Sequence, residues 1–228
     1  MVKKFFKVLV IVSFAVVSVA WAEGKSRYFE PDMLEKLYPT PEGLDLNDIV
    51  LGDLTHNGSG CRPSTVEATM TADKKKIAVL FSNYAARVDE DEDYDDKDCN
   101  LAIPVVVPPG ISVGIIGIAW RGSVRTKSGG EVELYREYFF SGKQGPRKLD
   151  WWSDGDRERF ILEDKIPFAE MLWSDCDGEE YVARVDTEIL AEGEGSRIKI
   201  RSADITGSLI FYLAFRSCEI GSDSDSDE

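Results

Sequence analysis

The sequence predicts an all-β protein, an antiparallel β-sandwich of jelly-roll-like arrangement that is held by two disulfides. Short runs rich in β-branched and aromatic residues recur along the chain, and Gly, Pro, Asn and Asp separate them. Four cysteines in a chain with an export signal predict the disulfides. The clearest runs are Thr65–Thr71, Lys76–Phe81, Asn100–Val107, Ser112–Arg125, Glu131–Phe140, Arg159–Leu162, Tyr181–Ala191, Arg197–Ile200 and Ser208–Arg216.

Alternation supports this prediction, because a strand with one face in the core places every second side chain inward. Charged and hydrophobic residues interleave in Glu131–Phe140 and alternate strictly in Arg197–Ile200. The longest run, Ser112–Arg125, contains or follows several glycines, which predict a bulge or bend where one strand serves both sheets. These glycines are Gly110, Gly114, Gly117 and Gly122.

Residues 1–22 resemble a secretory signal peptide. Lys3, Lys4 and Lys7 form a positive n-region, and Val8–Ala20 is an apolar segment too short to span a bilayer. Small residues at Ala20 and Ala22 predict cleavage before Glu23. We therefore expect a secreted or periplasmic protein without membrane insertion.

Three further segments follow the predicted leader. Residues 23–47 form a polar lead-in, in which Pro31–Tyr38 predicts two helical turns with Pro31 at the first helical position. Residues 48–218 form the predicted β-sandwich domain. Residues 219–228 form an acidic tail whose composition is typical of disorder.

Cys61, Cys99, Cys176 and Cys218 allow three disulfide pairings, among which the sequence does not decide. We favour the sequential one, Cys61 with Cys99 and Cys176 with Cys218, because each bridge would join a neighbouring set of strands. Zinc ligands favour cysteines two to four residues apart, whereas no two cysteines here are closer than 38 residues. The spacing therefore argues against a zinc site.

The charge of the chain is strongly negative, with 42 acidic against 27 basic side chains and a net charge of −15. Such a charge argues against nucleic acid and anionic membranes as partners, because both require a basic face. The negative charge is concentrated in residues 89–98, which hold eight acids in ten positions, and in the tail.

The acidic segment satisfies the first three ligand positions of an EF-hand loop with Asp89, Asp91 and Asp93. Tyr94 and Asn100 occupy the positions that require Gly and Glu, so a true EF-hand is rejected. A looser calcium site is the remaining cofactor hypothesis, and its alternative is a solvated, self-repelling loop. The candidate ligands are Asp89, Asp91, Asp93 and Asp95.

Catalytic residues are not predicted. His56 is the only histidine, and no Gly-x-Ser-x-Gly motif is present, so the sequence does not predict a Ser-His or Cys-His catalytic arrangement. Two carboxylates about 5–10 Å apart would suffice for a glycosidase, which we keep as an alternative. The candidates are Asp150, Asp154 and Asp156 beside Trp151 and Trp152, and Asp175, Asp177, Glu179 and Glu180 beside Trp173.

Trp151 and Trp152, with Trp120 and Trp173, suggest a stacking platform for a sugar ring. Adjacent residues of a strand point to opposite faces, so the core readily buries only one of Trp151 and Trp152. The other is the candidate glycan contact.

An ordered series of segments resembles a known family. The segments are Gly58–Pro63, Ala78–Tyr84, Lys97–Leu101, Val113–Gly122, Tyr138–Gly142, Trp173–Cys176 and Phe215–Cys218. The series is similar to the secreted family catalogued as domain of unknown function 4360, and it runs from about Ile49 to Cys218. The resemblance implies an exported, disulfide-stapled β protein with no established activity, so it supplies no catalytic residues. The acidic segment before Cys99 and the acidic tail depart from the family pattern.

The sequence thus predicts an exported, non-catalytic protein with a binding, structural or surface-interaction role and an acidic loop that calcium would order. The alternative is a secreted carbohydrate-active protein, either a glycan-binding module or a carboxylate-dependent glycosidase. The expected partner is an extracellular protein or a glycan.

Overall fold

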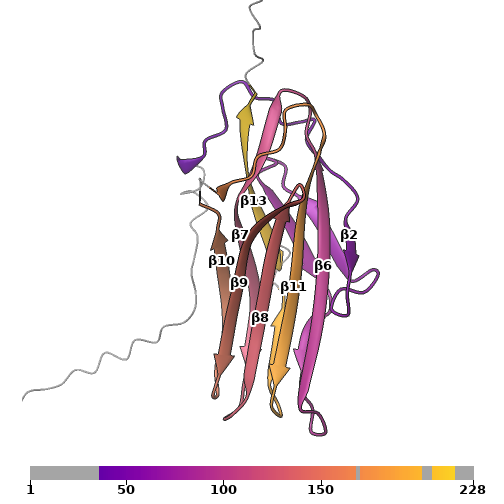
Figure 1. Ribbon diagram of the computed structural model, residues 1–228, viewed down its shortest axis with the longest axis vertical. Coiled ribbons are helices and arrows are strands. Elements are labelled where there is room, and N and C mark those ends of the chain that lie inside the picture. The colour runs from indigo at the N-terminus through magenta and orange to yellow at the C-terminus, as the bar shows by residue number, and fades with distance from the viewer. Residues whose placement is uncertain (1–35, 168–169, 202–206, 219–228) are drawn as a thin grey trace, which may run out of the picture.

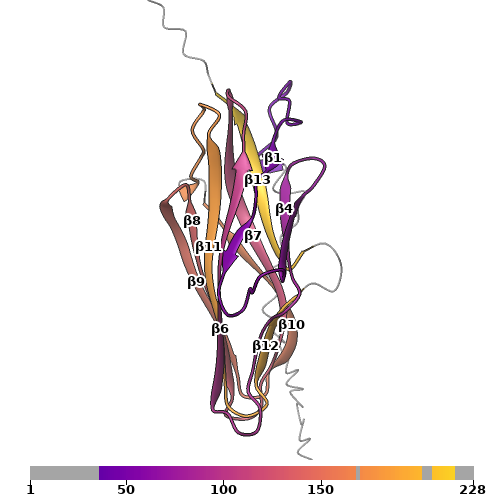
Figure 2. The same cartoon turned by 90° about the vertical axis from the view of Figure 1, so that its right-hand side faces the viewer.

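The computed structural model describes residues 36–167, 170–201 and 207–218. They form two antiparallel sheets that pack face to face in an elongated sandwich (Figures 1 and 2). Sheet A contains β1 (Val50–Leu51), β2 (Thr55–Asn57), β6 (Tyr94–Val106), β8 (Glu131–Phe140), β9 (Lys143–Ser153) and β11 (Glu180–Glu192). Sheet B contains β3 (Val66–Met70), β4 (Lys76–Phe81), β5 (Tyr84–Arg87), β7 (Ile111–Arg125), β10 (Arg157–Lys165), β12 (Arg197–Ile200) and β13 (Leu209–Ser217).

The long strands set the order of each sheet. In sheet A the order is β1-β6-β11-β8-β9, with β2 also pairing β6. In sheet B the order is β3-β4-β13-β7-β12-β5, and β10 pairs the other side of β7. The predicted all-β antiparallel sandwich is confirmed.

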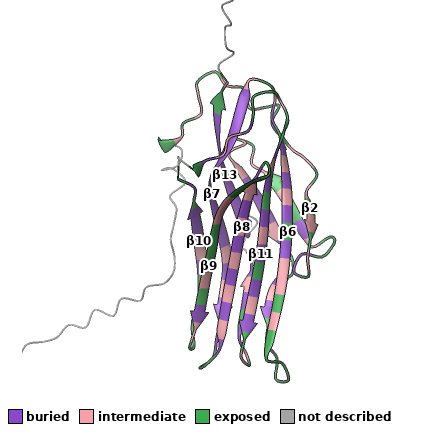
Figure 3. Cartoon of the chain, viewed as in Figure 1, coloured by how far each residue is buried: buried purple, intermediate pink, exposed green. Residues whose placement is uncertain are grey.

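Alternating burial explains why these segments are strands. Along β8, side chains alternate between partly and fully buried through all ten residues, and β11 shows the same period of two (Figure 3). The inward side chains of both sheets meet in one core. Its largest members include Trp120, Trp152, Tyr84, Tyr138 and Tyr181.

Strand prediction succeeded for runs with clear alternation or a continuous apolar stretch, and it failed for a largely polar strand. Lys76–Phe81, Glu131–Phe140 and Arg197–Ile200 match β4, β8 and β12 residue for residue. Strand β9 was missed because its first half is polar and contains Gly145 and Pro146. An edge strand tolerates such residues, since one side of its backbone has no partner strand.

The expectation that the glycine-rich run serves both sheets was wrong. Strand β7 stays within sheet B, where it pairs β10 on one side and first β13, then β12, on the other. The expected bulge is present, because the register with β13 shifts between Tyr212 and Leu213. Gly122 has a packing role: a Cβ there would lie 2.3 Å from the ring of Phe160.

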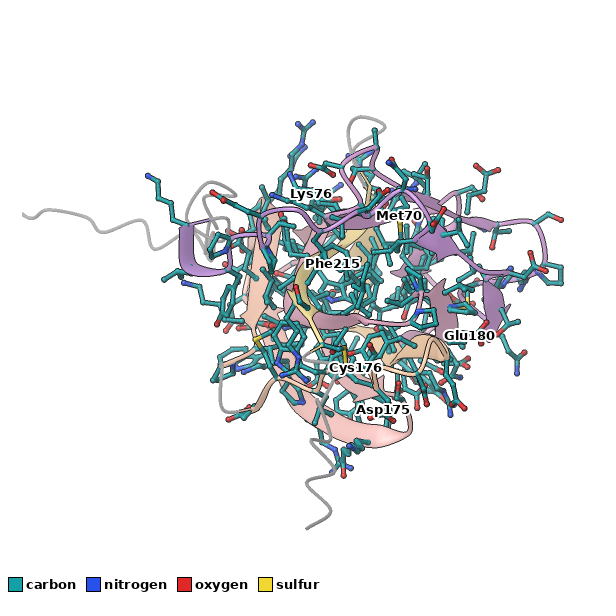
Figure 4. The ribbon with its side chains drawn as sticks, turned by 90° about the horizontal axis from the view of Figure 1, so that it is seen from above. Met70, Lys76, Asp175, Cys176, Glu180 and Phe215 are labelled. Atoms are coloured by element: carbon teal, nitrogen blue, oxygen red, sulfur yellow. A yellow bond between two sulfur atoms is a disulfide. The ribbon has the colours of Figure 1, made fainter. Side chains whose placement is uncertain are left out.

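The two disulfides are Cys61–Cys99 and Cys176–Cys218, which is the sequential pairing. The first joins the segment after β2 to β6. The second joins the segment before β11 to the residue after β13, and Cys176 is labelled in the view along the long axis (Figure 4).

A buried ion network joins the two sheets at the edge formed by β9 and β10. The guanidinium of Arg136, on β8, is 1% exposed and donates to Asp164 on β10 at 2.8 Å and to Asp150 on β9 at 2.6 Å. Tyr138 donates to Asp164 and accepts a 2.7 Å hydrogen bond from Trp120. Burial opposes the charge of Arg136, yet Tyr138, Asp164 and the hydrogen bonds hold its pKa above the ordinary value.

The predicted leader, residues 1–22, and the predicted tail, residues 219–228, lie outside the described residues, as do residues 23–35 of the lead-in and with them most of the predicted helical turns of Pro31–Tyr38. Among the residues that are described, no helix is long and apolar enough to span a bilayer.

We expect Asp164→Asn to destabilise the domain strongly, because it leaves the buried Arg136 without one of its two carboxylates. Breaking a buried ion pair from one side costs about 3–5 kcal/mol, which corresponds to a fall in Tm of about 6–20 °C for a domain of this size. Thermal unfolding followed by circular dichroism measures the shift.

The matched control is Arg147→Gln, which breaks the pair between Arg147 and Glu137 on the outer face of sheet A. Arg147 is mostly exposed, so its loss should change the free energy of unfolding far less than the loss of the Asp164 carboxylate. Equal shifts in the two variants would contradict a structural role for the buried network.

Candidate functional site

One end of the sandwich gathers four turns that cross between the sheets (Figures 1 and 2). We call it the crossing end; its turns are residues 88–93, 126–130, 154–156 and 193–196. Backbone hydrogen bonds tie the turns to one another, including Val88 N to Ser196 O and Thr126 N to Asp156 O. These hydrogen bonds therefore fix the strand ends of both sheets relative to one another near this end.

The outer face of sheet A near the crossing end is acidic. Its registers place Glu131 beside Glu192, and Asp98 beside Glu188. Desolvation, followed by the negative charges of Glu131, Glu192 and Glu188, raises the pKa of Glu133 on this face. We call this surface the acidic face; its carboxylates are Asp96, Asp98, Glu131, Glu133, Glu188 and Glu192.

The two adjacent tryptophans of β9 point to opposite sides of sheet A. Trp152 is 1% exposed, stacks on Phe160 at 5.0 Å and donates from Nε1 to Glu158 at 2.5 Å. Trp151 is 53% exposed and lies opposite Glu133 in the register, with the exposed Leu149 two residues along the same face. This corrects the candidate pair: Trp152 belongs to the core, and only Trp151 can contact a ligand on the acidic face.

The acidic segment 89–98 is shorter as a loop than its composition suggested. The turn ends at Asp93, and Asp95 lies on β6, half-buried, because β6 pairs β11 along its whole length. Asp95 accepts hydrogen bonds from Lys97 Nζ and from the backbone N–H of Arg87. One cation and one backbone N–H thus already occupy its two oxygens.

Asp89 pairs with the guanidinium of Arg87 at 2.6 Å, while Asp91 and Asp93 are exposed in the turn. Within the described ranges, no three His, Cys, Asp or Glu side chains are placed to hold a metal ion together. Calcium binding stays a prediction for this turn.

Four of the seven carboxylates considered for glycosidase chemistry accept hydrogen bonds with a structural role. Asp150 belongs to the Arg136 network, Asp154 accepts from Gly129 N, and Asp156 accepts from Ser153 N. Beside Trp173, Asp177 accepts from Glu179 N at 3.1 Å. These contacts hold turns and sheets together.

His56 and Trp173 also have structural contacts. His56 lies on β2, half-buried, and its Nδ1 donates to Cys61 O at 2.8 Å. The guanidinium of Arg216 lies 4.5 Å from the ring centroid of Trp173, and Trp173 forms an isolated bridge with Gly114. Both residues thus support the local structure.

The outer face of sheet B near the crossing end carries a row of arginines. In the registers Arg157 lies opposite Arg125, Arg125 opposite Arg197, and Arg197 opposite Arg87. Each one is the first or last residue of the strand that enters or leaves a crossing turn. All four are exposed.

Further basic residues extend this row along the strands. Arg159 and Lys199 flank Ser123 in the next outward row, and Arg201 N donates to Arg121 O one row beyond. We call the combined surface the basic platform; it consists of Arg87, Arg121, Arg125, Arg157, Arg159, Arg197, Lys199 and Arg201.

Two shallow hollows of about 420 and 400 Å³ lie on the platform and share Arg125 and Arg197. Asp89, Glu90 and Glu194 line the second hollow, where the crossing turns form its rim. The first hollow is bordered by Arg157, Arg159, Lys199 and Arg201, with Glu158 as its only acidic lining residue among those described.

Sequence reasoning missed the platform because it located the acidic segments but did not follow the basic residues along the predicted strands. The alternation Arg197-Ile-Lys-Ile-Arg201 was itself a signal, since it places three cations on one face of a strand. Nothing in the sequence shows that Arg87, Arg125 and Arg157 join them.

Comparison with known proteins yields one curated relative, an uncharacterized secreted protein of Arthroderma benhamiae. It is 24% identical over 136 residues, which cover 58% of this chain and 55% of the relative, so the match spans about half of its length. A secreted relative and two disulfides agree with an extracellular protein.

Solved structures give weak matches. TmCBM61 in complex with beta-1,4-galactotriose is 14% identical, with 72% of this chain and 88% of that chain covered and a TM-score of 0.22. The family 11 carbohydrate-binding module of Clostridium thermocellum is 9% identical, with 75% and 89% covered and a TM-score of 0.16. TM-scores this low carry no argument about fold or ligand.

The family comparison is more extensive. A family model matches residues 47–218, about three quarters of the chain and nearly the whole described sandwich. The match agrees with the resemblance noted from the ordered cysteine, glycine and aromatic segments. The chain belongs to the family described as Domain of unknown function (DUF4360).

Proposed function

We propose that this protein is an exported, non-catalytic glycan-binding protein whose contact surface is the acidic face around Trp151. The observation that carries the proposal is the 53% exposure of Trp151 beside Leu149, itself 55% exposed. A large indole on a flat sheet face is suited to stack on the apolar face of a sugar ring.

The carboxylates around Trp151 supply the polar half of such a contact. Glu133 lies opposite Trp151, and Asp96 lies two strands further along the same row of side chains. Ionised carboxylates accept hydrogen bonds from sugar hydroxyls or ammonium groups. Because this face is negative, we assign it neutral or amine-bearing sugars rather than acidic ones.

Rigidity also favours Trp151 as a binding residue. Its neighbours in sequence, Asp150 and Trp152, are held by Arg136 and by Glu158 with Phe160. The backbone that carries the indole is therefore fixed on both sides, so binding would order little besides the indole itself.

We expect Trp151→Ala to weaken the binding of a retained glycan about tenfold or more, because the stacking surface is lost. The measurement is native affinity electrophoresis of the oxidised protein in gels that contain soluble β-glucan, xylan, galactan or chitosan.

Tyr94→Ala is the control, since Tyr94 is an exposed aromatic residue on the opposite edge of the same sheet. It should leave the mobility shift unchanged. The proposal would be refuted if none of these polysaccharides retarded the protein. It would also be refuted if the Trp151→Ala variant migrated like the original.

We also expect Glu133→Gln to stabilise the fold at pH 7. The pKa of Glu133 is raised in the folded state, so its ionised form opposes folding, and this cost disappears as the pH falls through the raised pKa. Like charges on neighbouring strands destabilise by about 0.2–1 kcal/mol, which predicts a rise in Tm of about 0.5–4 °C.

The rise should shrink when the melt is repeated near pH 4, where Glu133 takes up a proton. Glu179→Gln, at an exposed site away from this face, should show no such rise. A gain that is independent of pH would contradict charge repulsion as its cause.

A further inference from the structure

We propose that the basic platform on the outer face of sheet B is a second binding site, and that its ligand is an acidic polysaccharide carrying carboxylate or sulfate groups. This site lies on the opposite side of the sandwich from Trp151, so it does not depend on the glycan contact proposed above.

The platform holds cations that have no anionic partner within the described part of the chain. Arg87 pairs with Asp89, but no ion pair is recorded for Arg125, Arg157, Arg159 or Arg197. Like charges placed directly opposite one another on neighbouring strands are destabilising. A protein with a net charge of −15 that keeps four arginines in one row retains a repulsion that a bound anion would relieve.

The spacing of the row fits a linear chain of anionic groups. Neighbouring strands lie about 4.8 Å apart, so the four arginines of β10, β7, β12 and β5 span about 14 Å across the sheet. The next outward row, with Arg159 and Lys199, lies about 6.7 Å further along the strands. A polymer that crosses the strands would thus meet cations along two parallel lines.

Arginine is suited to the groups we assign. The guanidinium presents a planar fork of donors that binds carboxylate or sulfate oxygens in pairs, and it stays charged at every physiological pH. Seven of the eight cations of the platform are arginines. The shared chemistry is therefore bidentate hydrogen bonding from a guanidinium to an oxyanion, for carboxylate and sulfate alike.

Nucleic acid fits the platform less well than a polysaccharide. Proteins that bind single strands stack bases on aromatic side chains, whereas no described residue lining the two hollows is aromatic. The platform is a flat sheet face and offers no helix or ribbon to enter a duplex groove.

The test uses the full-length mature protein and four probes: polygalacturonate, heparin, neutral dextran and single-stranded DNA. Binding is measured by biolayer interferometry at 50 and 300 mM NaCl. We expect polygalacturonate or heparin to bind, dextran not to bind, and the affinity to fall about 10- to 100-fold at the higher salt as counterions compete. Comparison of the first two probes distinguishes carboxylate from sulfate as the preferred group.

The double variant Arg125→Gln with Arg197→Gln removes the two arginines shared by both hollows. It should weaken acidic polysaccharide binding about 10- to 100-fold. Its Tm should stay the same or rise, because the substitution relieves repulsion. The matched control, Arg147→Gln with Arg184→Gln, removes two arginines from the outer face of sheet A and should bind as the original does.

Several results would overturn the proposal. Binding of neither acidic polysaccharide, or equal loss in both double variants, would remove the site. Binding of DNA alone would assign the platform to nucleic acid instead. Salt-sensitive self-association that the Arg125 and Arg197 double variant abolishes, without polysaccharide binding, would assign the platform to the acidic face of a second copy. Acidic polysaccharide binding should persist in Trp151→Ala, because that variant removes only the glycan contact on the other face.

Discussion

The buried guanidinium of Arg136 is the interaction on which both outer faces depend. It links β8 to β9 through Asp150 in its own sheet and to β10 through Asp164 in the other sheet. Strands β9 and β10 are edge strands, so sheet hydrogen bonds hold each of them on one side only. Because β9 carries Trp151 and β10 carries Arg157 and Arg159, one desolvated ion network positions the contact residues of both proposed sites.

The second constraint is the segregation of charge between the sheets. Alternation sends the acids of β6, β8 and β11 outward from sheet A and the arginines of β7, β10 and β12 outward from sheet B. Two opposite fields result, each confined to its own face by a sandwich core of low polarity. Ligands of different charge would therefore be drawn to different sides of the same molecule.

Local pattern predicted much of this fold, and its failures have physical causes. Strands β8 and β12 were predictable because each alternates between core and solvent, and β4 because it is a nearly continuous apolar run. Strand β9 was not, because an edge strand needs fewer hydrophobic residues. Asp95 was placed in a loop because composition alone does not show that β6 continues to Tyr94 by pairing with β11. For Trp151 and Trp152, periodicity predicted that they face opposite ways, but only the sheet register shows which one is buried.

What the sequence by itself determined are properties carried by neighbouring residues: the strands with clear alternation, the all-β class, the leader pattern as a prediction, and the family series of cysteines, glycines and aromatics. What only the tertiary structure decided is where the charges meet. Arg157 lies opposite Arg125, Arg125 opposite Arg197, and Arg197 opposite Arg87, although the residues of these pairs are 32, 72 and 110 positions apart along the chain. The physical reason is that electrostatic interaction falls off within about 10 Å through space, so strand register, and not the net charge of the chain, determines the field that a ligand meets.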